Sequence, residues 1–516
     1  MTSTIHFASA LMGSGKTRSM IKAVETDRLY IVAAPKLDLS QEIAKQFSEM
    51  RPDINIEAIN SDSVCSGSTV RCEAIEAICR ATDQLEFSEM FGIEGNAGKV
   101  ILVTHATLTN LPPDIMGRCT VIVDEVPSIC RNNYKTIFSD QFDRLFDGAV
   151  KIDQETGELS LENGMKFEAT TRLYKARSAE LHHEEMVYDG LLNPTSEVTA
   201  EHHPKAADKY ILKSIGYIDL EPVFRGAEEV HVMGNAIRKT LFYLYIQSRG
   251  FSFEVSEFTP TFDGYKLPPK MVPLIKGERF SKSMMLTRPD GTKADKFDET
   301  TFGWQLMKEA LDYHAGEPVL FHGYDWMKTF FDENRYPNVV VIGHDSRGLN
   351  EYRDYHRSAH MLHGNAPPVN SQMNQRMLEI MGVDPAEGNR SLRHEAHVEP
   401  VSQAMLRGVM RKGSSQEQQM VSVVPTTGFI DALRDNLGMD VEVDASLLRK
   451  PPEAKEKTSH SPAKESEREA KRAAKQEKRE AALRMLAEGC SFSAVSRTLP
   501  VDRKTVRKWA QEERAA

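Results

Sequence analysis

The residues with the clearest chemical potential lie close to the N-terminus. Ala10-Leu-Met-Gly-Ser-Gly-Lys-Thr17 fits the spacing A/G-x-x-x-x-G-K-S/T of a phosphate-binding loop. Glycines in such a loop let backbone N–H groups turn toward phosphate oxygens. Five residues would form this cradle: Gly13, Ser14, Gly15, Lys16 and Thr17. We expect Lys16 to reach the β and γ phosphates and the Thr17 hydroxyl to bind Mg²⁺, so ATP and Mg²⁺ are the predicted cofactors.

Two adjacent carboxylates follow an apolar run about 110 residues further on. Thr120-Val-Ile-Val-Asp-Glu-Val-Pro127 is typical of a buried strand that ends in Asp124 and Glu125. Ligands of open α/β sheets bind at the carboxyl ends of parallel strands. We therefore expect Asp124 to hold Mg²⁺ and Glu125 to orient and polarise the water that attacks a phosphoryl group.

A second set of charged side chains lies at the C-terminus. Asp502 is a favourable N-cap for a helix over Arg503–Arg514, which follows a short helix over Ser491–Thr498. The pattern resembles the helix-turn-helix modules of resolvases and other bacterial or phage DNA-binding proteins, whose second helix enters the major groove. The resemblance directs five residues toward DNA: Arg503, Lys504, Thr505, Arg507 and Lys508. A small helical protein-interaction domain is the alternative.

The elements that must position these residues alternate between strands and helices. Short apolar runs predict strands over Ile5–Ala8, Leu29–Ala33, Val100–Thr104, Thr120–Asp124, Val230–Met233, Val319–Phe321, Val339–Ile342 and Met420–Val424. Amphipathic stretches predict helices over Lys16–Glu25, Leu39–Met50, Lys239–Arg249, Phe302–Tyr313, Val369–Met381 and Pro400–Arg411. Alternation of this kind predicts an α/β fold with parallel sheets.

Changes in this rhythm predict the domain organisation. We expect a first lobe over residues 1–258 that holds the ATP site, with an irregular accessory insertion over 131–225 that includes a hairpin near Lys151–Leu161. A second lobe over 259–445 would begin with a connection rich in Pro, Gly and charge over 259–300. A charged linker or helix over 446–480 and a helix-turn-helix over 481–516 complete the prediction.

Charge is distributed unevenly along the 516 residues. The net charge is −10, but the segment from Arg449 to the end carries 18 basic and 11 acidic side chains, a local net charge of +7. A basic tail on an acidic body suggests contact with a polyanion. The six cysteines form no disulfide pattern and no apolar run is long enough to span a membrane, so we expect free thiols and a cytoplasmic protein.

The N-terminal motifs resemble those of superfamily 2 (DEAD/DEAH-like) helicases and translocases. Asp124-Glu125-Val126-Pro127 is similar to their DExx box, and Ala33–Gln41, with Pro35, is similar to motif Ia. Val103–Leu108, with Thr104 and His105, resembles motif Ib, and Gly234-Asn-Ala236 occupies the place of motif III. The resemblance implies that Pro35, Thr104 and His105 contact DNA.

The second half of the chain carries two further resemblances. Asp345–Asn350 is similar to motif V, which implies that Gly348 contacts DNA. Gln403-x-x-x-Arg407-x-x-x-Arg411 is similar to motif VI, whose arginine stabilises the transition state from the opposite lobe. The spacing leaves open whether Arg407 or Arg411 has this role. The family resemblance covers about residues 1–430 and implies two RecA-like lobes in tandem, with ATP in their cleft.

Together these observations predict an ATP-dependent DNA helicase or translocase. Single-stranded DNA would lie across the lobes and duplex DNA would meet the C-terminal module, with a role in replication initiation; RNA is a weaker candidate partner. By analogy, this architecture would suit a phage or plasmid protein. Three alternatives stay open: an ATPase that remodels protein–DNA complexes, a DNA-binding regulator switched by ATP, and a packaging motor.

Overall fold

The computed structural model describes most of the chain up to residue 452 and part of the tail. The described residues are 3–11, 13–60, 69–91, 99–203, 206, 208–262, 264–314, 316–333, 336–343, 352–365, 367–437, 440–452, 478–488, 495, 498, 499 and 501. The chain divides into two compact units, one of Met1–Leu286 with Lys296–Pro451 and the other of Thr287–Asp295 with Pro452–Ala516.

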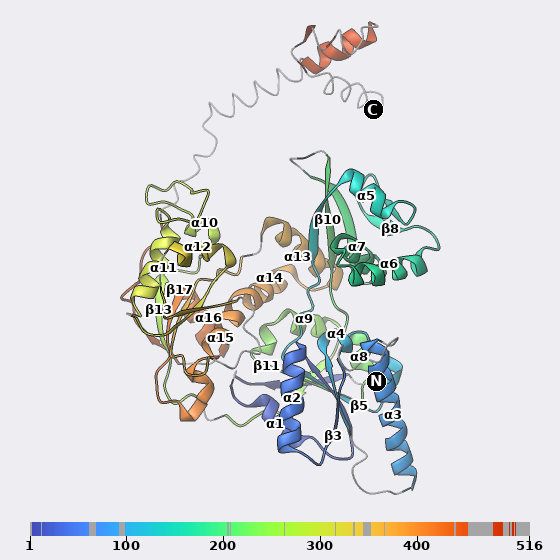
Figure 1. Ribbon diagram of the computed structural model, residues 1–516, viewed down its shortest axis with the longest axis vertical. Coiled ribbons are helices and arrows are strands. Elements are labelled where there is room, and N and C mark those ends of the chain that lie inside the picture. Colours follow the sequence, from blue (N-terminus) through green and yellow to red (C-terminus); the bar gives the residue numbers. More distant parts are fainter. Residues whose placement is uncertain are drawn as a thin grey trace. The chain divides into compact units, whose positions relative to one another are not determined.

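The first lobe is built on a seven-stranded sheet in which every neighbouring pair is parallel (Figure 1). Its order is β12-β1-β11-β5-β2-β4-β3. The strands are β1 (Thr4–Ser9), β2 (Leu29–Ala34), β3 (Asn55–Ala58), β4 (Lys99–Thr104), β5 (Cys119–Asp124), β11 (Glu229–Gly234) and β12 (Ser252–Val255). All six residues of β2 and of β5 are buried, which explains their continuous apolar sequences.

Helices cover both faces of this sheet. Helices α1 (Lys16–Ala23) and α2 (Leu37–Met50) pack on one face, and α3 (Val70–Phe91), α8 (Glu221–Gly226) and α9 (Leu241–Ser248) pack on the other. A short helix, α4 (His105–Leu108), follows β4. Since all the strands are parallel, their carboxyl ends meet at one edge, where β1 leads into the predicted phosphate loop and β5 ends at Asp124.

An accessory part with its own core is inserted between β5 and β11. It contains the antiparallel sheet β6-β10-β9, the hairpin β7-β8 and three helices. Their bounds are β6 (Asn133–Phe138), α5 (Ser139–Phe146), β7 (Val150–Ile152), β8 (Leu159–Leu161), α6 (Lys166–Ser178), α7 (His182–Leu192), β9 (Ser196–His202) and β10 (Lys209–Gly216). Phe146, Tyr188 and Leu212 are buried in a cluster separate from the core of the first lobe. The predicted hairpin is present as β7 and β8.

The second lobe has a six-stranded parallel sheet in the order β15-β14-β16-β17-β13-β18. The strands are β13 (Lys270–Ile275), β14 (Val319–His322), β15 (Val339–Ile342), β16 (Arg357–His360), β17 (Val421–Thr426) and β18 (Glu442–Val443). The helices in this half of the chain are α10 (Lys282–Met285), α11 (Phe302–Asp312), α12 (Thr329–Glu333), α13 (Pro368–Met381), α14 (Pro385–Arg393), α15 (Glu399–Met405) and α16 (Thr427–Leu437). The predicted α/β class with two parallel-sheet lobes in tandem is therefore confirmed.

The expected connection over 259–300 is wrong at its centre. Residues 270–275 form β13, an interior strand between β17 and β18, and five of its six residues are buried. Pro273 pairs in register with Val424, although proline is unusual inside a sheet. This strand was not predicted because the prolines at 268, 269 and 273 are typical of a linker.

The expected helix over Pro400–Arg411 is also wrong in its second half. Helix α15 ends at Met405, and a 3₁₀ segment runs from Val409 to Ser415. Residues 406–408 separate them, and a side chain at Gly408 would place its Cβ 2.3 Å from the Tyr355 carbonyl oxygen. The break changes the direction of the chain before Arg411.

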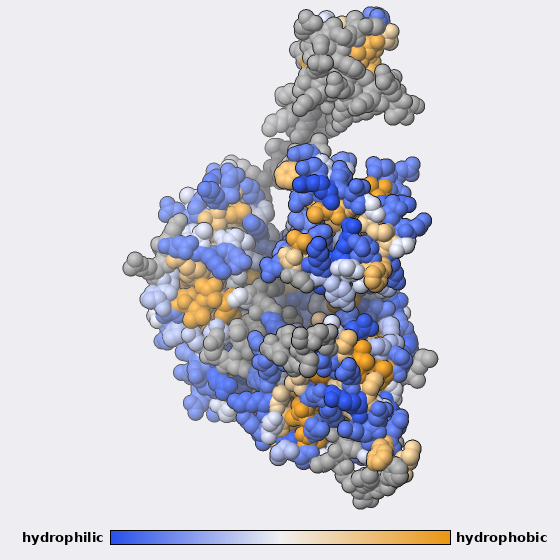
Figure 2. Space-filling view, turned by 45° about the vertical axis from the view of Figure 1, so that its right-hand side comes forward, coloured by the Kyte–Doolittle hydropathy of each residue, from blue (hydrophilic) through white to orange (hydrophobic). Residues whose placement is uncertain are grey.

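The tail is described only in part. Residues 478–487 are helical, and Ala482 and Val495 are buried in a small apolar cluster with Leu483, Leu486 and Leu499. Most of the predicted helix-turn-helix, including Arg503, Lys504, Thr505, Arg507 and Lys508, lies outside the described residues. Among the described helices, none is long and apolar enough to cross a membrane, and the face seen in Figure 2 is mainly hydrophilic with smaller hydrophobic patches.

Candidate nucleotide site

The loop between β1 and α1 has the backbone shape that a phosphate cradle needs. Gly13 and Gly15 have φ of 75° and 84°, values that residues other than glycine rarely adopt. Helix α1 begins at Lys16, directly after Gly15, so its first backbone N–H groups face the loop. Ser14 Oγ is buried and makes no hydrogen bond within the described chain, which leaves a polar atom for a ligand.

Lys16 is folded back onto this loop. Its Nζ donates to the carbonyl oxygens of Ala10 at 2.8 Å and of Leu11 at 3.0 Å. Burial lowers the pKa of Lys16, while Asp124, Glu399 and Glu125 act in the opposite direction. An anion in the loop would give this ammonium a better partner than two neutral carbonyls.

The carboxylate at the end of β5 lies next to the helix start. Thr17 Oγ1 is 3.5 Å from both oxygens of Asp124, and Asp124 is 4% exposed. Burial, with a contribution from Glu125, raises the pKa of Asp124 to about 7. A hydroxyl and a buried carboxylate make an all-oxygen donor set, which fits Mg²⁺.

Glu125 has a backbone conformation that is rare for its residue type. Its φ is 64°, in the left-handed region that costs a residue with a side chain about 1 kcal/mol or more. His105 from α4 fixes the adjacent peptide, because its Nε2 lies 3.0 Å from the Asp124 carbonyl oxygen and must donate to it. The chain therefore turns sharply at Asp124 and Glu125, and both residues line the same cavity.

Residues from both lobes line that cavity, which has a volume of about 260 Å³. Lys16, Thr17, Asp124 and Glu125 lie on the first-lobe side, and Gln403, Leu406, Arg407 and Arg411 on the second-lobe side. Arg411 lies close to the loop, since a Cβ built on Gly13 would lie 3.4 Å from the Arg411 Cα.

Arg411 carries a charge that the described residues compensate only in part. Its Nη1 is buried and makes no hydrogen bond among the described residues. Burial lowers the pKa of Arg411, and the nearby Arg407 lowers it further, while Glu42 acts in the opposite direction. A partly buried guanidinium with an unsatisfied nitrogen favours an anionic ligand, because a polar group that is buried without a partner is costly.

Sequence reasoning missed one wall of the cavity. Helix α2 contributes Leu39, Glu42, Ile43 and Gln46, which share one helix face at spacings of three and four. The i, i+3, i+4, i+7 pattern was visible in the sequence, but half of it is polar. A polar stripe on a helix is normally a solvent-exposed face. Only the position of α2 beside the loop shows that this face lines the cavity instead.

The other predicted residues lie near the same sheet edge. Pro35 follows β2, and Thr104 ends β4 and caps α4 by accepting from Thr107 N at 3.3 Å. Gly234 ends β11, and its carbonyl oxygen accepts from Ala10 N at 3.0 Å, which ties the expected motif III segment to the phosphate loop. Gly348 and the rest of the expected motif V lie outside the described residues.

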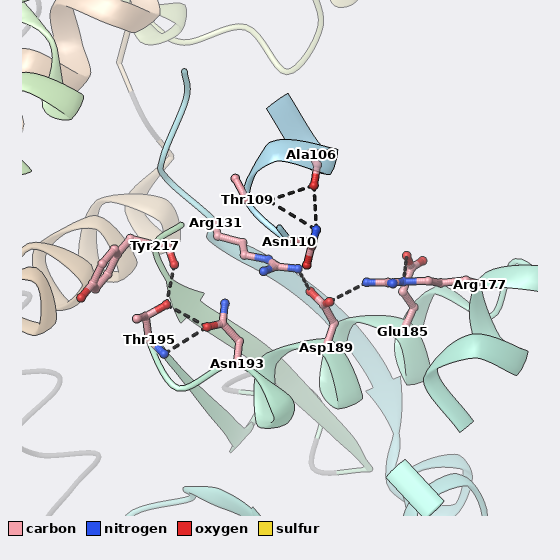
Figure 3. Close-up of polar contacts among 10 residues, drawn as sticks. All are labelled: Ala106, Thr109, Asn110, Arg131, Arg177, Glu185, Asp189, Asn193, Thr195 and Tyr217. Carbon is pink, nitrogen blue, oxygen red and sulfur yellow. Dashed lines mark hydrogen bonds and ion pairs between the residues drawn. The ribbon is translucent and has the colours of Figure 1, made fainter. Parts of the chain in front are cut away.

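The chain that leaves Glu125 is anchored in the insertion (Figure 3). Arg131 pairs with Asp189 of α7, and Arg177 of α6 donates to the other Asp189 oxygen at 2.7 Å. Thr195 donates to the Tyr217 carbonyl oxygen at 2.6 Å where the chain returns to the first lobe. These contacts hold both connections of the insertion at its base.

Helix α13 connects the second half of the chain to the first lobe and to the insertion. Met373, Met377 and Met381 are buried in the same cluster as Tyr245 of α9. Arg376 donates to both Glu197 oxygens of β9, at 2.8 and 2.6 Å. A helix from the second half of the chain is thus part of the first lobe's core, which the sequence did not predict.

Comparisons with known proteins add only distant structural likenesses. No protein-family model and no curated protein sequence matches the chain. The structure of S. tokodaii Xpd4 has a TM-score of 0.45 and 10% identity, over 86% of this chain and 96% of that chain. S. cerevisiae Dbp5 bound to RNA and ADP BeF3 has a TM-score of 0.33 and 10% identity over 86% and 85% of the two chains. T4 UvsW has a TM-score of 0.21 and 9% identity over 86% and 74%.

At such identities and TM-scores these likenesses carry no argument about activity. The site is therefore defined by its own geometry. In an α/β protein with two parallel sheets, a glycine loop, a lysine, a pair of carboxylates and an arginine from the facing lobe line one cavity.

Proposed function

We propose that this protein is an ATP- and Mg²⁺-dependent DNA helicase or translocase. The observation that supports this best is the position of Arg411. Its backbone, carried by the second lobe, lies against Gly13, and its Nη1 is buried and unsatisfied by the described residues in the cavity that also contains Lys16, Asp124 and Glu125. An arginine so placed makes closure of the lobes depend on the nucleotide, and hydrolysis then releases the closure.

Each of these residues has a separate role in ATP hydrolysis. Lys16 leaves its two carbonyl partners to bind the β and γ phosphates, and the loop amides after Gly13 bind the remaining oxygens. Mg²⁺, held by Thr17 and Asp124, would neutralise charge on the phosphates. Glu125 orients the attacking water and accepts its proton, while Arg411, with Arg407 beside it, stabilises the charge on the transferred phosphoryl group.

Nucleic acid is proposed to cross the carboxyl ends of the strands. Pro35, Thr104 and His105 lie at this edge of the first sheet, close to the acidic pair through the His105–Asp124 hydrogen bond. Binding of a nucleic-acid strand there would therefore be coupled to the position of Glu125. Duplex DNA is proposed to bind the basic C-terminal segment, which carries a local net charge of +7. Recruitment to an origin of replication fits this division.

The decisive experiment measures ATPase rates without nucleic acid and with single-stranded DNA, duplex DNA or RNA, with Lys16→Ala protein as the blank. We expect single-stranded DNA to stimulate turnover at least tenfold. Equal rates under all conditions would instead favour a regulator switched by ATP. Greater stimulation by RNA than by DNA would overturn the proposed substrate. Strand separation is then tested on a duplex with a single-stranded overhang.

A further inference from the structure

A compact cluster of histidines and glutamates lies at the end of β11 remote from the nucleotide loop. Glu229 begins β11, and His231 points to the same face two residues later. Glu257 follows β12 and reaches the same point. One ligand atom from each of these three side chains lies within 4.8 Å of the others. The loop meets β11 at Gly234, five residues from Glu229, which is roughly 16 Å along a strand.

The His231 ring is fixed with one nitrogen facing the carboxylates. The residue is fully buried, its Nδ1 lies 2.9 Å from Ser256 Oγ, and the rings of His6 and Phe258 contact it at centroid distances of 4.9 and 4.5 Å. Its Nε2 makes no hydrogen bond within the described chain, although Glu229 Oε1 is only 3.2 Å away. A metal-binding histidine has this arrangement, with the second nitrogen held by a hydrogen bond to a neighbouring group.

Carboxylates outnumber guanidinium groups among the described residues around His231. Arg28 binds Glu229 Oε2 at 2.8 Å, which holds that carboxylate in place and leaves Oε1 facing His231. One guanidinium thus accompanies three carboxylates, since Glu254 also approaches His6 at 3.9 Å.

We propose that Glu229 Oε1, His231 Nε2 and Glu257 bind a divalent transition-metal cation, with Zn²⁺ the best fit. One imidazole and two carboxylates suit Zn²⁺ better than Mg²⁺ or Ca²⁺, which prefer oxygen donors alone. His6 or water completes the tetrahedron. The ion would join β11 to the segment that follows β12, where the chain leaves the first sheet. Its role is structural, because the site is remote from the phosphate loop.

The test is Zn²⁺ binding by full-length protein after treatment with a chelator. Exposed thiols such as those of Cys72 and Cys79 would compete for Zn²⁺, so both are first replaced by serine. Excess Mg²⁺ keeps the nucleotide site occupied. We expect Glu257→Gln to weaken one equivalent of Zn²⁺ at least tenfold and to remove the rise in Tm on adding Zn²⁺. Because Glu257 is exposed, this variant should fold normally.

Two further variants complete the test. Glu49→Gln changes an exposed glutamate of α2 and should leave Zn²⁺ binding unchanged. His231→Gln should abolish binding, and with Co²⁺ as the probe it should remove the visible absorption of a tetrahedral site that lacks thiolate. The proposal is overturned if the Cys-substituted protein binds no Zn²⁺, or if Glu257→Gln and Glu49→Gln bind it equally.

Discussion

The Glu395 carboxylate accepts a hydrogen bond from the backbone N–H of Leu241 at 2.6 Å and thereby connects the two lobes. Leu241 begins α9, shortly after the Gly234–Ala236 segment that touches the phosphate loop. Glu395 lies in a π-helical turn over His394–Val398, just before the helix that carries Gln403. Irregular turns of this kind are frequent at functional sites. The contact links the backbone beside the loop to the segment that delivers Arg411.

This contact should depend on pH. Burial raises the pKa of Glu395 from 4.5 to about 7. The folded protein therefore holds the proton more tightly than the unfolded chain, so this group's contribution to the free energy of unfolding falls as pH rises from 4.5 to 7. Glu395→Gln keeps an acceptor and removes the charge. At pH 8 it should raise the free energy of unfolding by up to about 3 kcal/mol, with little change at pH 4.

Denaturant unfolding at both pH values measures this difference. Glu387→Gln, which changes an exposed glutamate of α14, is the matched control and should have no effect at either pH. An equal effect of Glu395→Gln at pH 4 and pH 8 would contradict a buried, titrating carboxyl.

Nucleotide binding and hydrolysis should separate in two variants. Lys16→Ala removes the ammonium that binds the phosphates, so both nucleotide affinity and turnover should be lost. Glu125→Gln keeps the loop intact and impairs only the activation of the attacking water. We therefore expect kcat to fall about 10²–10⁴-fold while nucleotide still binds. Titration with a fluorescent nucleotide, alongside ATPase rates, distinguishes the two. Equal loss of binding in both would refute the division of roles.

The geometry separates the two candidate arginines. Arg411 lies against Gly13, so Arg411→Ala should lower kcat about 10³-fold or more with little change in nucleotide affinity. Arg407→Ala should have a smaller effect on kcat. Arg411→Lys tests whether charge alone suffices, since lysine lacks the planar fork of donors. If Arg407→Ala is the more damaging variant, the finger is Arg407 and the lobes must shift before catalysis.

Acid should destabilise the second lobe through its buried histidines. Burial lowers the pKa of His314, His394 and His397 to about 4, below the usual 6.5. The unfolded chain binds protons more readily, so these groups favour folding above pH 6.5 and that contribution is lost as pH falls toward 4. His314→Gln should reduce proton uptake on unfolding at pH 5 by about one. His182→Gln, at an exposed position, should not.

Removing the basic tail should separate the ATPase from its recruitment to duplex DNA. The first compact unit ends at Pro451, so a chain that stops there keeps the whole cavity. ATPase stimulated by short single strands should persist, while duplex affinity and its salt dependence should fall, because fewer phosphates are neutralised. Replacing Arg503 and Arg507 together should have much of the same effect. An unchanged salt slope after truncation would identify the tail as a protein-interaction element.

Local sequence determined those parts of the protein that depend on neighbouring residues. The phosphate loop lies between a strand and a helix because Gly13 and Gly15 permit its turns, and Asp124 ends a strand because the preceding run is apolar on both faces. Eight predicted strands are present, each within about two residues of its predicted bounds. The α/β class followed from this alternation alone.

Only the tertiary structure decided what depends on residues distant in the chain. Strand β13 is interior because β17 and β18 pair on both sides of it, which no local signal around Pro273 could indicate. Arg411 reaches Gly13 because the helix before it breaks at Gly408, and Gly408 is required by the approach of Tyr355. His231 and Glu257 come close together because β11 and β12 lie on either side of β1 in the sheet. Strand order and close backbone approaches are set by the packing of whole elements. The periodicity of a single segment therefore cannot predict them.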